Sequence, residues 1–99
     1  MNVEWTLGAI SDLASIYQHI ASDSARYAVS VVDRMTHRTH QLSAFPLSGC
    51  MVPEYQREDV REVLEYSYRI IYHVGESQVS ILAVIHGASK LPELSTIER

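Results

Sequence analysis

The spacing of hydrophobic residues changes along the first half of this chain. Val3 and Trp5 alternate with polar neighbours, which predicts a short opening strand. Thr6 can then cap a helix, because apolar residues recur at intervals of three and four from about Leu7 to Ala21. The predicted core-facing stripe of this helix contains Ile10, Leu13, Ile16, Tyr17 and Ile20. A turn at residues 22–24 is followed by a second stripe of this kind, so two antiparallel amphipathic helices are expected.

The second half has the pattern of a loop followed by strands. Residues 45–59 hold two prolines and a glycine and have no regular period, which predicts a long connecting loop. Three strands are predicted after it: "VREVLE" from Val60, "YSYRIIYHV" from Tyr66 and "QVSILAVIH" from Gln78. Gly75 fits a tight hairpin link between the last two, and Pro92 limits the tail to a short turn of helix.

This order of elements, β, α, α, β, β, β, predicts an α+β fold with two antiparallel helices packed on one face of a mainly antiparallel sheet. In the strand from Tyr66, residues Tyr68 and Tyr72 belong to the face expected to carry the helices. Arg69, Ile71 and His73 belong to the other face. The sheet therefore has a second face that the two helices do not cover.

The last strand is apolar on both faces. Strict alternation places Val79, Ile81, Ala83 and Ile85 on one side, and Leu82 and Val84 on the other. Apolarity on two sides indicates cover on two sides. The second face must then be closed by the loop, by the tail or by another chain.

Arg69 puts a permanent cation in this second face. It is expected either to pair with Glu62 or Glu65 on the neighbouring strand or to meet a ligand, and the pattern does not separate these two roles. An apolar groove that contains an arginine is typical of a partner-binding surface.

The composition of the chain argues against some kinds of function. The length of 99 residues predicts a single domain over residues 1–99. A formal net charge of −4 argues against direct binding of nucleic acid. The start of the chain has no leader pattern, no apolar run approaches a membrane span, and the lone Cys50 fits a reducing compartment, so a cytoplasmic protein is expected.

His37 and His40 are three positions apart on a predicted helix, a spacing that can share a metal ion. No carboxylate or cysteine is evidently placed to complete a ligand set. We therefore expect neither a metal nor a cofactor.

Several short motifs follow one another in the second half of the chain. They are Pro53-Glu54, Arg61-Glu62, the Tyr-Arg-Ile-Ile-Tyr run at 68–72 and a closing Ile-His before small residues at 85–88. In this order they resemble the ParE branch of the RelE/ParE superfamily of bacterial toxin–antitoxin modules. "EWT" and "FPLSG" in the first half agree as well, so the resemblance covers nearly the whole chain. It implies the βααβββ fold that the hydrophobic pattern predicts.

The superfamily divides by target. Members similar to RelE cut mRNA on the ribosome with lysines, arginines and often a histidine or a C-terminal tyrosine, whereas members similar to ParE are associated with poisoning DNA gyrase. Here "VREVLE" has no lysine, Ala88 and Ser89 follow the last strand where an arginine is common, and no tyrosine follows Tyr72. RNA cleavage needs a base, an acid and cations. The resemblance therefore implies a gyrase inhibitor that acts by binding.

Two alternatives remain open at this stage. A ribosome-dependent endoribonuclease would rely on Arg69, His86, Arg61 and Glu54. A toxin-derived protein without toxicity would serve only as a partner or co-repressor of the antitoxin.

The resemblance also implies a ParD-like antitoxin in a hetero-oligomer with this chain. We expect the C-terminal segment of the antitoxin to fold on binding and to lay apolar side chains across the second face. The expected contact residues are Arg61, Arg69, Ile71, His73, Leu82 and Val84.

Overall fold

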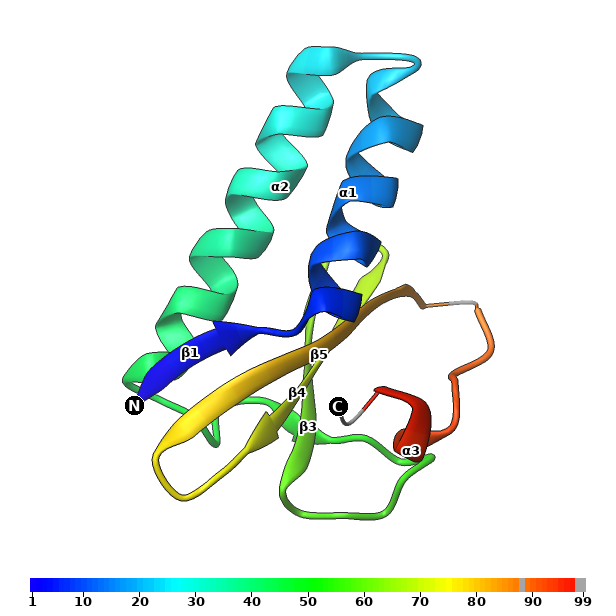
Figure 1. The fold of residues 1–99 in the computed structure, drawn as a ribbon. Coiled ribbons are helices and arrows are strands. Elements are labelled where there is room, and N and C mark those ends of the chain that lie inside the picture. The colour runs from blue at the N-terminus through cyan, green and yellow to red at the C-terminus, as the bar shows by residue number, and fades with distance from the viewer. Residues whose placement is uncertain (88, 98–99) are drawn as a thin grey trace.

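The computed structural model of the chain describes residues 1–87 and 89–97, except for the side chain of residue 96. The elements are β1 (Asn2–Trp5), α1 (Leu7–Ala21), α2 (Ala25–His40), the 3₁₀ turn η1 (Gln41–Ser43), β2 (Cys50–Met51), β3 (Val60–Glu65), β4 (Tyr68–Val74), β5 (Gln78–His86) and α3 (Leu94–Ile97). Figure 1 shows α1 and α2 side by side on one side of the sheet. The predicted α+β fold is confirmed.

The five strands form one mixed sheet in the order β1-β5-β4-β3-β2. β1 runs parallel to β5, and the other neighbours are antiparallel. The short strand β2 lies inside the segment predicted as loop and pairs only Cys50 with Glu62 and Met51 with Arg61. Two residues are too few to give a readable period, so the sequence pattern missed this strand.

Side-chain caps start both long helices and tie the first one to the sheet. The Thr6 hydroxyl accepts a hydrogen bond from the Ala9 amide and donates to the Ile81 carbonyl at 3.0 Å. Ser24 caps α2 by accepting from the Tyr27 amide. The predicted cap at Thr6 is therefore confirmed, and it also fixes where α1 leaves the sheet.

An irregularity in β5 rearranges its two faces. Ile71 pairs with Ala83 and Tyr72 pairs with Ile81, so Leu82 is an extra residue in β5. Asp12 of α1 accepts a hydrogen bond from the Val84 amide at 3.0 Å, just beyond this bulge. The helix thereby satisfies a backbone donor next to the bulge.

The bulge corrects the expected sides of β5. Val79, Ile81 and Val84 pack in the core beneath the helices, whereas Leu82, Ala83 and Ile85 pack on the opposite side. The expectation that Leu82 and Val84 share a face is wrong, because strict alternation assumes a strand without an extra residue. For β4 the expectation is confirmed, with Tyr72 in the helix-side core and Ile71 in the opposite one.

The chain itself covers the second face. Val52 and Tyr55 of the loop and Leu91, Leu94 and Ile97 of the tail pack against Ile71 and Leu82. The Tyr55 hydroxyl donates a 2.6 Å hydrogen bond to the Pro92 carbonyl, which joins the loop to the tail. Figure 1 shows α3 on the side of the sheet away from α1 and α2. The loop and the tail thus close the face that the sequence left open.

A buried tyrosine holds the start of the long loop to the sheet. The Tyr72 hydroxyl accepts from the Gly49 amide at 3.0 Å and donates to the Pro46 carbonyl at 2.8 Å. A Cβ atom at Gly49 would lie 2.5 Å from the Glu62 carbonyl oxygen and from the Tyr72 hydroxyl. Only glycine fits this close approach without rearrangement.

Candidate functional site

Arg69 lies on the second face of the sheet and is enclosed by two carboxylates. Its Nη1 and Nη2 atoms donate to the two carboxylate oxygens of Glu54 at 2.8 and 2.9 Å, and its Nε donates to Glu62 Oε1. The side chains of Arg69 and Glu62 are only 13% and 14% exposed. Of the two pairings expected from sequence, the one with Glu62 is confirmed, while Glu65 pairs with Arg34 instead.

The charges of this cluster stabilise one another. The hydrogen bonds from Arg69 lower the pKa of Glu54 to about 2, and the two carboxylates raise the pKa of Arg69. Glu54 therefore stays ionised far below neutral pH, which makes it a poor general base for chemistry at pH 7. Arg69 thereby directs three of its five N–H groups to carboxylates, and the negative charge of these carboxylates would oppose an approaching phosphate.

A second ion-pair cluster stands at the start of β3. Asp59 accepts hydrogen bonds from Arg57 at 2.6 and 2.9 Å and lies 3.0 Å from His73 Nε2. The hydrogen bonds from Arg57 have the largest effect, and together with the contact to His73 they lower the pKa of Asp59 to about 2. His73 thus has a local acidic partner that fixes its ring.

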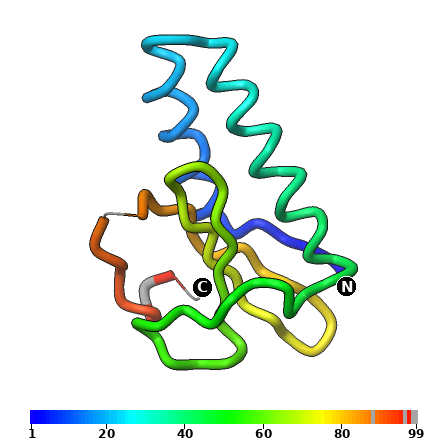
Figure 2. The backbone as a smooth tube through the Cα atoms, turned by 180° about the vertical axis from the view of Figure 1, so that it is seen from behind, coloured from blue at the N-terminus to red at the C-terminus, as the bar shows by residue number. Residues whose placement is uncertain are grey.

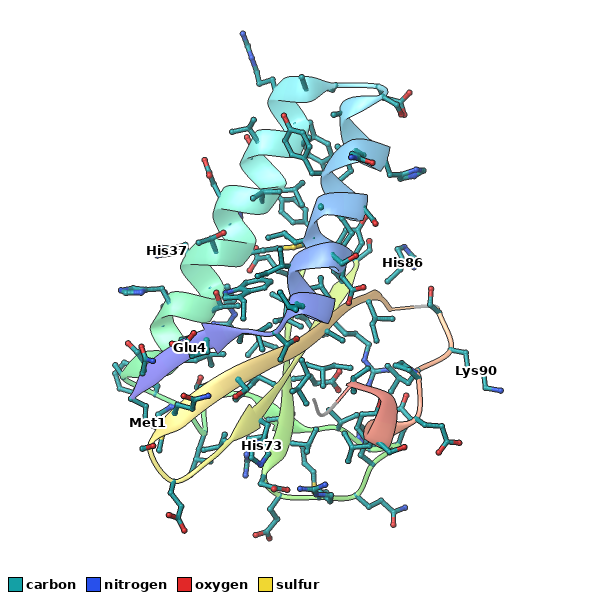
Figure 3. All side chains as sticks on the ribbon, viewed as in Figure 1. Met1, Glu4, His37, His73, His86 and Lys90 are labelled. Carbon is teal, nitrogen blue, oxygen red and sulfur yellow. The ribbon has the colours of Figure 1, made fainter. Side chains whose placement is uncertain are left out.

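The structure separates the residues of the ribonuclease alternative. Arg69 and Glu54 lie on the second face, whereas His86 packs edge-on against Tyr68 of the helix-side core, with 5.6 Å between ring centroids. Arg61 binds backbone, with Nη1 on the Gly49 carbonyl and Nε on the Glu58 carbonyl, both at 3.0 Å. Figure 3 shows His86 close to the helices and far from His73. Arg69 and His86 therefore do not converge on one reacting centre.

The residues expected to contact an antitoxin are also divided between the two faces of the sheet. Arg69, Ile71, His73 and Leu82 belong to the second face, while Val84 faces the helices. Ile71 and Leu82 are 0% and 4% exposed beneath the loop and the tail. The groove expected there is filled by the chain itself, and the antitoxin contacts stay a prediction.

The sequence pattern missed an exposed apolar row on α1. Leu13, Ile16 and Ile20 pack against the core as expected. Ile10 and Tyr17 were assigned to the same stripe, which is wrong, because they are 50% and 37% exposed. Leu7 is 86% exposed. The spacing of 7, 10 and 17 would have revealed a second apolar row on this helix.

Other kinds of site find no support in the described part of the chain. No three residues among its histidines, cysteines, aspartates and glutamates are arranged to hold a metal ion, and this includes His37 and His40. None of the helices described is long and apolar enough to cross a membrane.

The fold and these ion pairs define a small α+β domain. Two helices lie on one face of a mixed sheet, and carboxylates hold Arg69 on the other. Residues 3–91 match the family model described as the ParE toxin of the type II toxin-antitoxin system parDE, and the chain belongs to this family.

Comparison with solved structures supports the fold. A chain titled "Chromosomal ParDE TA system from P. aeruginosa" superposes with a TM-score of 0.73 at 21% sequence identity. The match covers 87% of this chain and 95% of that one. No curated protein sequence matches this chain.

Proposed function

We propose that this ParE-family toxin inhibits DNA gyrase by binding it and performs no chemistry of its own. The observation that carries the proposal is the enclosure of Arg69 by Glu54 and Glu62. The two carboxylates take three of the five N–H groups of Arg69, their charge opposes an approaching phosphate, and His86 packs on the opposite face. Membership in the ParE toxin family supports a toxin that acts on a macromolecular target.

The direct test uses purified gyrase, supercoiled plasmid and the free toxin. The toxin should trap gyrase on cleaved DNA, so linear DNA should accumulate after protein denaturation in proportion to the toxin concentration. A toxin sample heated past its unfolding transition is the control. Unchanged supercoiling and no linear DNA at saturating toxin would contradict the proposal.

We further propose that a ParD-like antitoxin neutralises the toxin. The solved neighbour is titled as a ParDE system, which supports a partner of this kind. The exposed row Leu7, Ile10 and Tyr17 of α1 offers apolar area that a partner helix could cover. To reach Ile71, Leu82 and the Arg69 cluster, the antitoxin would have to take the place of the tail.

A matched pair of α1 variants tests the apolar row. Ile10→Asp puts a charge into the proposed interface, while Ser15→Asp puts the same charge on an exposed position of α1 away from the row. Ile10→Asp should weaken antitoxin binding at least tenfold, which corresponds to about 1.4 kcal/mol, and Ser15→Asp should weaken it much less. Equal affinities of the two variants would remove α1 from the interface.

A further inference from the structure

We infer that a tyrosine-lined cavity beneath the tip of the helix hairpin binds an arginine side chain of a protein partner. The cavity measures about 360 Å³, within the range of small-ligand pockets, roughly 300–1,000 Å³. Its described lining includes Tyr27, Tyr66, Tyr68, His19, His86 and Asp23. This inference goes beyond the proposed function and does not require that the target be gyrase.

The aromatic walls are oriented to attract a cation. Tyr27 and Tyr66 meet edge to face, with 6.0 Å between centroids and an angle of 83°, and the two residues are 50% and 45% exposed. An edge-to-face pair leaves ring faces open, and the electron-rich face of a tyrosine attracts guanidinium groups. The cluster already holds one such group, because the guanidinium carbon of Arg34 lies 5.4 Å from the Tyr66 centroid. Arg34 does not line the cavity, so Tyr27 and Tyr68 remain for a ligand.

The charge of the cavity favours the same ligand. Asp23 is the one acidic residue in the described lining, which contains no lysine or arginine. Its carboxylate has no ion-pair partner among the residues described. The C-terminus of α1 and the N-terminus of α2 meet here, and their opposite partial charges offset each other. The cavity therefore repels phosphates and carboxylates.

The backbone conformation of Tyr66 supports a role for its side chain in binding. Tyr66 has a φ of 55°, a conformation that glycine and asparagine adopt far more easily than an aromatic residue. It forms a two-residue turn with Ser67 between the paired residues Glu65 and Tyr68, and the Ser67 carbonyl accepts from the Gly87 amide at 2.7 Å. Figure 2 shows this β3–β4 turn rising toward the helices. A tyrosine at a strained turn position is explained if its ring forms part of a binding wall.

Arginine fits the cavity better than other cations. Its planar guanidinium can stack on a tyrosine face while its N–H groups donate to the Asp23 carboxylate. A divalent metal is disfavoured because a single carboxylate does not make a metal site, and no such group of ligands occurs in the described residues. The net charge of −4 on the chain would further attract a basic partner segment.

The test titrates the intact protein with N-acetyl-arginine amide and follows the tyrosine ring resonances by NMR. The matched probe is N-acetyl-citrulline amide, which has nearly the same shape and no charge. The arginine probe should shift the resonances of Tyr27, Tyr66 and Tyr68 with a saturable response, and the citrulline probe should bind at least about fivefold more weakly. Equal responses to the two probes, or no saturable shift at these tyrosines, would overturn the inference.

Two aspartate variants locate the site. Asp23→Asn should weaken binding of the arginine probe about fivefold, because it removes the charge at the cavity. Asp33→Asn removes an equal charge from an exposed position of α2 outside the cavity and should leave binding unchanged. Both variants alter exposed residues, so both should fold. An Asp23→Asn protein that binds the probe as well as Asp33→Asn does would contradict the assignment.

Discussion

Arg69 is enclosed by two carboxylates on a face of the sheet that is otherwise packed with apolar side chains. Glu62 is almost as buried as Arg69, whereas Glu54 reaches the surface. A buried carboxylate that loses its cation keeps its desolvation penalty without a compensating attraction. Removing Arg69 should therefore lower the free energy of unfolding, even though the intact cluster contributes little net stability. The role of Arg69 in the fold is to neutralise Glu62 and to join the loop to β3 and β4.

Replacing Arg69 should therefore destabilise the protein strongly. Arg69→Gln should lower the free energy of unfolding by about 3 kcal/mol, because Glu62 remains buried without a cation. Arg34→Gln is the control, since the side chain of Arg34 is 66% exposed and its pair with Glu65 is expected to contribute less than about 1 kcal/mol. Urea unfolding of both variants measures the difference. Similar losses for the two would show that Arg69 has no special structural role.

Acid should weaken the fold through Glu54 and Asp59. The pKa of each is about 2 in the folded protein, below the ordinary values of 4.5 and 3.8, so the unfolded chain takes up protons first as the pH falls. The stability that these carboxylates contribute is present above about pH 5 and is lost progressively toward pH 2. Urea midpoints of Glu54→Gln across this range should fall less steeply than those of the parent protein. An equally steep fall in both would refute the assignment.

Among the elements, hydrophobic periodicity predicted the regular ones well. The bounds of α1 and β5 agree with the sequence pattern, because α1 has a long regular period and β5 is a long apolar run. The bulge at Leu82 could not be predicted, since it depends on pairing with β4 and on the hydrogen bond from the Val84 amide to Asp12. Arg69 was recognised as unusual, but its pairing with Glu54 required a loop whose path leaves no periodic signal.

A matched pair of glycine variants tests how tightly β2 and the loop are held. Gly49→Ala would place a methyl group 2.5 Å from backbone and from the Tyr72 hydroxyl, so it should destabilise the protein by about 1–3 kcal/mol. Gly8→Ala in α1 meets nothing closer than 3.9 Å and should be neutral or stabilise by up to about 1 kcal/mol. Thermal unfolding of both variants distinguishes them. A Gly49→Ala protein as stable as the parent would mean that the backbone at residue 49 is not held tightly against β3 and Tyr72.

For the whole molecule, both faces of the sheet are covered, but by unequal means. Two long helices cover one face, and a loop with a four-residue helix covers the other. The smaller cover has fewer apolar contacts to lose, so it is the part that a partner can most easily replace. Its attachment includes one 2.6 Å hydrogen bond from Tyr55 to Pro92.

Loosening this tail should favour an antitoxin that takes its place. Tyr55→Phe removes the hydrogen bond to Pro92 and keeps the ring, so it should raise antitoxin affinity about threefold to tenfold, equivalent to about 1 kcal/mol. Ser30→Ala, which removes an exposed hydroxyl from α2 outside the proposed interface, is the control and should have a smaller effect. Calorimetric titration measures both. Reduced or unchanged affinity for Tyr55→Phe would indicate that the tail stays in place in the complex.

The most direct test of binding without chemistry compares the two possible targets with one toxin preparation. The toxin is incubated in parallel with gyrase and supercoiled plasmid, and with ribosomes carrying a defined mRNA. Because Arg69 is held by Glu54 and Glu62 and lies on the face opposite His86, the account predicts trapped gyrase–DNA cleavage products and an intact mRNA. Cleavage of the mRNA that disappears with Arg69→Ala, together with unaffected gyrase, would contradict it.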